Sequence, residues 1–344
     1  MRAARHADDL DAPEPMSAAD SPGRRTLLGV DVVLSTPRRP PPAASLRGRV
    51  VVLDLAFAHS KPSGRHPSVT HRLLHELGAR LACYLDHHDS AFHADFAHDP
   101  RFLLTTKAAH GACPELVTPE VVRAAGRVDT IVCHNDLDGL ASAAKWLLGG
   151  VEPYEGCDDD ARAVDTRVGP LSARGRLMDL ALRGAPDDEG LRLDLLELLL
   201  RRLDHPEAWR RVERAAALAA AREEAAARLA AGYRLLGPRV AFVDASAAPE
   251  PFDRTHLLLL GQERAQVAAV RVGDSVTFAA PFESGVNLLE LFELSGGMPT
   301  VASVPAKRLA RCLCALDVPR GLAWSLADRL GLTAPPPPPS TEDS

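Results

Sequence analysis

Short apolar runs alternate with amphipathic stretches over residues 49–183. Four of the runs have the length and composition of buried strands, namely residues 50–53, 81–85, 131–133 and 161–164. Three stretches between them have helical spacing, namely residues 70–79, 118–125 and 139–148. Strands that alternate with helices in this way predict an α/β fold built on a parallel sheet.

The second half of the chain has a different pattern. Residues 190–236 are rich in Leu, Ala, Arg and Glu and predict two helices, the second long and covering residues 207–235. We interpret these helices as a connector between two lobes. Beyond them, four runs look like strands and one stretch looks helical, which predicts a smaller α+β unit: residues 240–243, 257–260, 267–272 and 276–278, then 305–316.

Both ends of the chain are rich in proline and polar residues and are expected not to fold. We therefore divide the sequence into a disordered N-terminal segment, an α/β domain, a helical connector, a second domain and a disordered tail. The expected bounds are residues 1–47, 48–189, 190–236, 237–332 and 333–344.

Composition narrows the class of protein. Hydrophobic residues make up 46% of the 344 residues, but no apolar stretch approaches the ~18 residues that span a bilayer. The N-terminus lacks the apolar core of a signal peptide, so we expect a cytoplasmic protein without a membrane partner. Six cysteines without CxxC pairing fit free thiols in a reducing compartment. The net charge of −6 argues against strong general attraction to nucleic acid.

Polar side chains of the kinds that bind metals follow each of the four predicted strands of the first domain. They are Asp54, the tripeptide Asp86-His87-His88, the cluster His134-Asn135-Asp136-Leu137-Asp138, and Asp165. The carboxyl ends of parallel strands line one crevice, so these four segments should meet there. Carboxylates with one or two imidazoles suit a divalent transition metal, and such centres usually hydrolyse phosphate esters.

These motifs resemble the DHH phosphoesterase superfamily, which includes RecJ-like exonucleases, oligoribonucleases, cyclic-dinucleotide phosphodiesterases and family II pyrophosphatases. The tripeptide Asp86-His87-His88 is similar to its DHH motif, and residues 134–142 are similar to its first motif. Asp54 resembles the single aspartate of the family's second motif, and Asp165 resembles that of its fourth motif. The resemblance implies a DHH catalytic domain and, over residues 237–315, a DHHA1-like substrate-binding domain.

The motifs depart from the family pattern in two ways. The first motif follows the DHH motif along the chain, which resembles a circular permutation within the domain. His134 stands two residues before Asp136, whereas the HxxxDxD members of the family have four. Whether His134 is a direct metal ligand therefore stays open.

The resemblance also implies roles for the residues. Two ions, Mn²⁺ or else Mg²⁺ or Co²⁺, would be bound by Asp54, His87, Asp136, Asp138 and Asp165, with His134 as a further candidate. His88 would contact the scissile phosphate, and Asp86 would orient the histidine pair. Six residues are candidates for binding substrate: Lys107, His110, Ser142, Arg254, Gly296 and Gly297.

The function expected from these features is metal-dependent hydrolysis of phosphodiester bonds in short oligonucleotides, dinucleotides or single-stranded nucleic-acid ends. Two alternatives stay open, namely a non-catalytic DHH-like protein that binds a nucleotide or regulates a partner, and a pyrophosphatase-like hydrolase. Aromatic residues make up only 4% of the chain, which favours short substrates over long nucleic acid. The oligomeric state stays open too, with a homodimer as one alternative.

Overall fold

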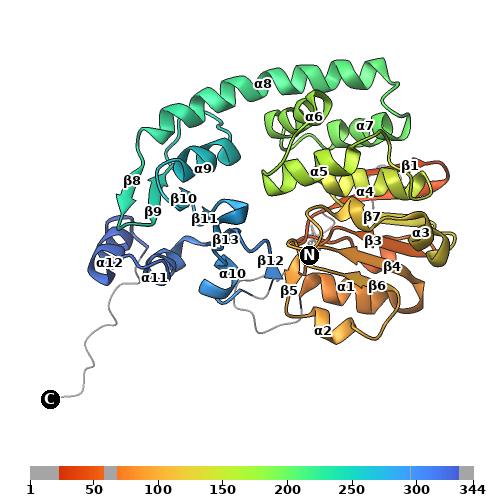
Figure 1. Cartoon of the computed structure of the whole chain (residues 1–344), viewed down its shortest axis with the longest axis horizontal. Helices are drawn as coiled ribbons and strands as arrows, with labels where there is room; N and C mark the ends of the chain where they lie inside the picture. The colour runs from red at the N-terminus through yellow and green to blue at the C-terminus, as the bar shows by residue number, and fades with distance from the viewer. Residues whose placement is uncertain (1–22, 58–67, 295, 333–344) are drawn as a thin grey trace, which may run out of the picture.

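The computed structural model describes residues 23–57, 68–294 and 296–332. It contains two large β-sheets, each covered by helices, and the long helix α8 (Pro206–Ala230) runs from one to the other (Figure 1). Among the described residues, no helix combines the length and the apolar character needed to span a bilayer. All six cysteines are free.

The first sheet has six strands in the order β1-β2-β7-β3-β4-β6. Strand β1 pairs antiparallel with β2, and the other neighbours are all parallel. Strand β7 lies between β2 and β3 although it follows β4 and β6 along the chain. The strands are β1 (Arg24–Leu27), β2 (Val30–Ser35), β3 (Val50–Leu53), β4 (Leu81–Asp86), β6 (Phe102–Leu104) and β7 (Thr130–His134).

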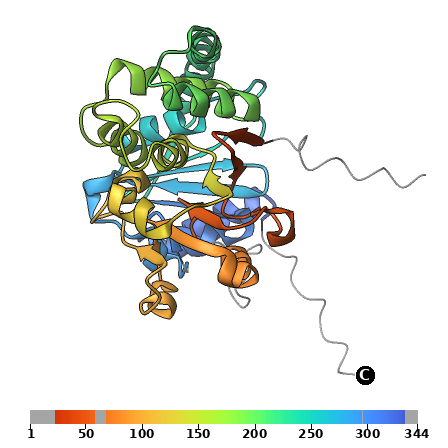
Figure 2. The same cartoon turned by 90° about the vertical axis from the view of Figure 1, so that its right-hand side faces the viewer.

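The central strands of this sheet are buried on both faces. Every residue of β3 and β4 is buried, as expected for parallel strands that read as continuous apolar runs. One face packs against a core to which α4, α7 and α8 contribute, and the other against a smaller core with α1 (Figure 2). The helices of this half are α1 (Val69–Leu77), α2 (His93–Phe96), α3 (Pro119–Ala125), α4 (Leu137–Leu147), α5 (Cys157–Thr166), α6 (Ala173–Gly184) and α7 (Glu189–Leu200), with 3₁₀ turns η1 (Ala43–Ser45), η2 (Gly78–Arg80) and η3 (Cys113–Leu116).

The second sheet has five strands in the order β13-β11-β10-β9-β8, and only β9 and β10 are parallel. Helix α9 covers one face, while α11 and α12 contribute to a core on the other. The elements are β8 (Arg234–Leu236), β9 (Val240–Asp244), β10 (Val267–Val272), β11 (Ser275–Ala279), β13 (Val301–Pro305), α9 (Arg254–Gln262), α10 (Leu288–Leu291), α11 (Leu309–Ala315) and α12 (Arg320–Arg329), with 3₁₀ turns η4 (Phe282–Ser284) and η5 (Ala306–Arg308).

A two-stranded ladder joins the two halves beside the tripeptide Asp86-His87-His88. Strand β5 (Asp89–Ser90) pairs antiparallel with β12 (Gly296–Gly297). The loop that directly follows His88 is therefore hydrogen-bonded to the glycine pair of the second half.

Several sequence-based expectations are wrong. Residues 24–35, expected to be disordered, form β1 and β2, and β2 extends the parallel sheet beside β7. Residues 161–164 lie in helix α5, not in a strand, because three aspartates in its first turn favour a helix N-terminus. Residues 257–260 lie in helix α9, where the Asp253 side chain caps the N-terminus. The long helix ends at Ala230, because residues 234–236 form β8.

The remaining predicted elements are confirmed, and their ends differ from the predicted bounds by at most four residues. The expectations for residues 1–22 and 333–344 lie outside the described residues.

Candidate metal centre

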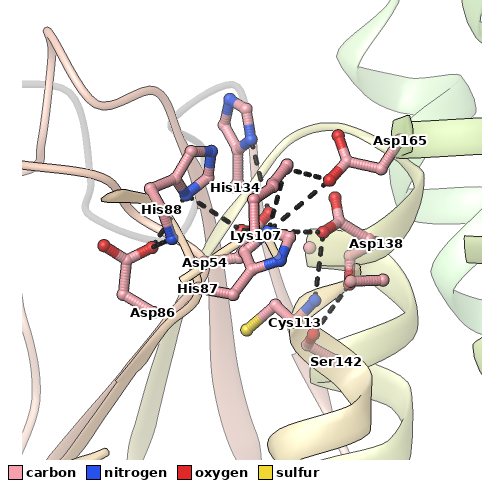
Figure 3. Close-up of polar contacts among 12 residues, drawn as sticks. Asp54, Asp86, His87, His88, Lys107, Cys113, His134, Asp138, Ser142 and Asp165 are labelled. Carbon is pink, nitrogen blue, oxygen red and sulfur yellow. Dashed lines mark hydrogen bonds and ion pairs between the residues drawn. The ribbon is translucent and has the colours of Figure 1, made fainter. Parts of the chain in front are cut away.

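Three neighbouring strands of the first sheet end in polar residues that meet at one point (Figure 3). Asp54 follows β3, Asp86 ends β4, and His134 ends β7. Strand β3 lies between β7 and β4, so its aspartate stands between the two histidine-bearing segments. The parallel arrangement thus brings together residues that are up to 80 positions apart in the sequence.

Asp54 is at the middle of this group and is fully buried. Its φ of 57° lies in the left-handed region, which Asp tolerates better than most side chains but which still costs energy. Its carboxylate oxygens lie 3.2 Å from His87 Nε2 and 3.5 Å from His134 Nδ1, but neither contact has the geometry of a hydrogen bond. Both oxygens are therefore buried without a hydrogen-bond partner among the residues described.

The surroundings keep the Asp54 carboxylate ionised. Burial and the carboxylate of Asp138 act to raise its pKa, but the imidazoles of His134 and His87 outweigh them and hold the pKa below its usual value. A buried, ionised oxygen pair without hydrogen bonds is costly unless a cation accompanies it.

His87 is held in an orientation that suits a metal ligand. Its Nδ1–H donates to the backbone carbonyl of His110 at 3.0 Å, which leaves the lone pair of Nε2 facing the other side chains. This Nε2 lies 3.2 Å from carboxylate oxygens of Asp54 and Asp138 and 3.6 Å from Asp165. The ring is fully buried.

His88 is held by Asp86, which is itself fixed from behind. The Nδ1 atom of His88 lies 2.8 Å from Asp86 Oδ1. The Tyr84 hydroxyl shares its single hydrogen between the Leu55 carbonyl at 2.7 Å and Asp86 Oδ2 at 3.2 Å. The carboxylate of Asp86 therefore orients His88 and is not free to bind a cation itself.

His134 and Asp136 form the opposite side of the centre. His134 Nδ1 lies 2.6 Å from Asp136 Oδ2, again without hydrogen-bond geometry. The other oxygen of Asp136 caps helix α4 by accepting from the Gly139 N–H at 3.3 Å. A Cβ at position 139 would lie 2.4 Å from the His134 carbonyl oxygen, so glycine is required where α4 begins directly below the strand.

Asp138 and Asp165 complete the group from two helices. Asp138, in the first turn of α4, is buried, and its Oδ2 accepts from the Cys113 N–H at 3.3 Å. Asp165 lies in the last turn of α5, and its Oδ2 contacts the ammonium of Lys107. Lys107 Nζ also lies 3.1 Å from His87 Nε2.

Lys107 is only 2% exposed, and its environment keeps it charged. Burial acts to lower its pKa, but the carboxylates of Asp165, Asp138 and Asp54 outweigh burial and raise the pKa above its ordinary value.

The donor set fits a divalent metal ion. Three groups of side chains each place their ligand atoms within 4.8 Å of one another: Asp54 with His87 and His88, Asp54 with His134 and Asp136, and His87 with Asp138 and Asp165. Carboxylate and imidazole ligands suit ions such as Mn²⁺, Co²⁺ or Zn²⁺, and the unpartnered oxygens of Asp54 provide the buried charge that an ion would neutralise.

The six expected substrate-binding residues lie in different places. Lys107 is inside the centre, His110 holds His87 through its carbonyl, and Ser142 is fully buried, with its hydroxyl donating to the Asp138 carbonyl at 2.7 Å. Arg254 is exposed at the start of α9, and Gly296 and Gly297 pair with the loop after His88.

A cleft of about 1220 Å³ opens beside the centre. Asp136, Asp138 and Asp165 line it from the first half of the molecule, and Arg254 and Thr300 are among the residues that line it from the second half. The acidic centre and a basic residue of the other half therefore face the same space.

One supporting residue was not predicted. Arg192, in α7, is 7% exposed, and its Nε donates to the Asn135 carbonyl at 2.6 Å, between His134 and Asp136. It also donates to the carbonyls of Asp188 and Pro186. An arginine in a leucine-rich helix carries no signal of this contact, which arises only when α7 packs against the strand end.

No known family model matches the sequence, and no curated protein matches it. Among solved structures, a pGpG-specific phosphodiesterase from Vibrio cholerae matches with 11% sequence identity and a TM-score of 0.37. The match covers 79% of this chain and 100% of that chain. Similarity this distant does not assign a function to the present chain, so the geometry of the centre has to do so.

Proposed function

We propose that this protein is a metal-dependent phosphoesterase of the DHH type that hydrolyses phosphodiester bonds in short oligonucleotides or dinucleotides. The observation that carries the proposal is the convergence of six aspartates and histidines around the unpartnered carboxylate of Asp54, at the edge of an open cleft. A purely structural cluster would satisfy its buried carboxylate with hydrogen bonds or a fixed cation.

Six residues of the centre offer ligand atoms to a metal ion: Asp54, His87, His134, Asp136, Asp138 and Asp165. A bound divalent ion would supply an acidified water as nucleophile and would neutralise charge on the phosphate. The protein's own residues orient these ligands: the His110 carbonyl fixes the ring of His87, and Asp86 fixes that of His88. We assign His88 to contact with the scissile phosphate.

The charge distribution of the cleft supports an anionic substrate of limited length. Arg222 and Arg254 line the cleft, and neither forms an ion pair with a described residue, so both are available to phosphate oxygens. Asp187 and the carboxylates of the centre line the same cleft and would repel the backbone of a long strand. Few phosphates could therefore be accommodated, which favours dinucleotides and short oligomers.

The test is a panel of hydrolysis assays with Mn²⁺. It compares a linear dinucleotide, a cyclic dinucleotide, a single-stranded oligomer and pyrophosphate, and it uses Asp136→Ala as the inactive variant. Asp159→Ala is the matched control, because Asp159 is an exposed acid on α5 outside the centre. We expect the linear dinucleotide to be cleaved fastest by the wild type and the Asp159→Ala variant, and no cleavage by Asp136→Ala. Full activity of Asp136→Ala, or no cleavage of any diester, would refute the proposal.

A further inference from the structure

The ligand groups of the centre differ in what their atoms already contact. In the group of Asp54, His134 and Asp136, both oxygens of Asp54 and the Nδ1 of His134 are buried without a hydrogen-bond partner among the residues described. In the group of His87, Asp138 and Asp165, each ligand atom has a partner. The first group is open to a cation, whereas the second is already satisfied.

The partner that satisfies the second group is mainly Lys107. Its Nζ lies 3.1 Å from His87 Nε2 and contacts Asp165 Oδ2, and Figure 3 shows it between these two side chains. The lysine is carried by a tight turn in which the N–H groups of Ala109 and His110 donate to the Thr106 carbonyl, each at 3.0 Å. Its own N–H donates to Asp89 Oδ2 at 3.3 Å. The backbone therefore holds the base of this side chain, and the charged end reaches the centre through a buried path.

We infer that the Lys107 ammonium takes the place of a second metal ion, so that each chain binds a single divalent ion through Asp54, His134 and Asp136. This inference rests on the proposed metal-dependent function and specifies its metal content. Lys107 is then a positioning residue: it neutralises Asp165 and fixes His87 while the single ion occupies the open group.

The geometry explains why the ammonium and a second ion exclude each other. An ion bound to His87 and Asp165 would have to bond directly to the ring nitrogen and to a carboxylate oxygen. The ammonium contacts these same two atoms, and its positive charge would repel a divalent ion strongly in a site shielded from water. The second position can hold either cation but not both.

The inference is tested by counting bound ions. Metal-stripped full-length protein is equilibrated with Mn²⁺, dialysed, and analysed by mass spectrometry of the metal per chain. Electron paramagnetic resonance then separates isolated Mn²⁺ from an exchange-coupled pair. The variant Lys107→Met removes the ammonium and keeps the length of the side chain. Lys145→Met is the matched control, because Lys145 is also a buried lysine paired with an aspartate, Asp158, but it lies outside the centre.

We expect one ion per chain with an uncoupled spectrum in the wild type and in Lys145→Met, and two coupled ions in Lys107→Met. Two ions in the wild type would overturn the inference and leave the proposed hydrolysis intact. One ion in a folded Lys107→Met variant would also overturn it, since the lysine would then not be what excludes the second ion. Binding of no ion by the wild type would overturn both this inference and the proposed function. The number of ions bound by the wild type decides whether each chain binds one ion or two, even if the Lys107→Met variant does not fold.

Discussion

Two acidic clusters border the same cleft, and they differ in how their charge is balanced. At the junction of α6, α8 and α9, Arg183 donates to Asp179 and Glu223, each at 3.0 Å, and it also pairs with Asp253. Arg167 adds a second contact to Asp179 at 3.2 Å. This junction cluster contains its own cations, so its charges are paired within the protein.

The centre around Asp54 gathers at least as many acids, but the one permanent cation that the described residues bring to it is Lys107, on one side. The oxygens of Asp54 have no hydrogen-bond partner there. The comparison shows that a group of acids does not by itself indicate a ligand site. What distinguishes the site is a buried carboxylate whose oxygens have no hydrogen-bond partner among the described residues.

The strongest test of this contrast is Asp54→Asn. The amide keeps the shape of the side chain but removes its negative charge. Asp54 belongs to two of the three groups of candidate metal ligands, so both groups lose this charge. We expect loss of detectable Mn²⁺ binding and of hydrolysis, with an unchanged circular dichroism spectrum, because the fold does not depend on a partner for this carboxylate. Retained Mn²⁺ binding at wild-type affinity would show that Asp54 is not at the centre of the metal site.

The junction cluster should respond in the opposite way. Arg183→Met leaves Asp179 and Asp253 buried without their main cation, which should lower the free energy of unfolding by about 3 kcal/mol. Its Mn²⁺ content should not change. Urea denaturation measures the effect, and Arg228→Met is the control, because Arg228 forms an exposed pair with Glu250 that is expected to contribute about 0.5 kcal/mol or less. Equal losses of unfolding free energy in Arg183→Met and Arg228→Met would contradict the expectation that the buried ion pairs contribute more stability than the exposed one.

A smaller effect is expected from the residue that orients His88. Asp86→Ala should lower Mn²⁺-dependent hydrolysis by about 10–100-fold, the usual cost of removing a side chain that orients a ligand or a catalytic histidine. Tyr84→Phe should cost less, because it removes only the hydroxyl behind Asp86. Steady-state kinetics would separate the two variants, and a larger loss in Tyr84→Phe would argue against the orienting role of Asp86.

The smallest effect should come from the far side of the cleft. Arg254→Ala is expected to raise KM for a dinucleotide by roughly threefold without changing kcat, since an exposed arginine contributes little binding free energy and does not contact the reacting atoms. Arg320→Ala, which removes an exposed arginine of α12 outside the cleft, should leave both constants unchanged. A fall in kcat in Arg254→Ala would mean that the second half contributes to the chemical step.

Much of the first half could be predicted from sequence. The apolar runs of β3, β4 and β7 are long enough and apolar enough to be recognised as buried strands. The polar residues at their ends directly follow these runs in the sequence, so their position at the sheet edge could be predicted too. Asp165 was predicted at the centre for a partly wrong reason, because it comes from helix α5 and not from a strand end. Strands β1 and β2 were missed because they lie in a segment whose overall composition is polar and rich in proline.

By itself, the sequence determined which chemistry is available: aspartates and histidines at strand ends, of types that bind divalent metals. Only the tertiary structure decided which of them are paired. That Lys107 reaches His87 and Asp165, that Arg192 holds the Asn135 carbonyl, and that Asp54 stays unpartnered all depend on distances between segments far apart in the chain. Packing decides which buried charges are paired, and these pairs cannot be predicted from the order of the residues alone.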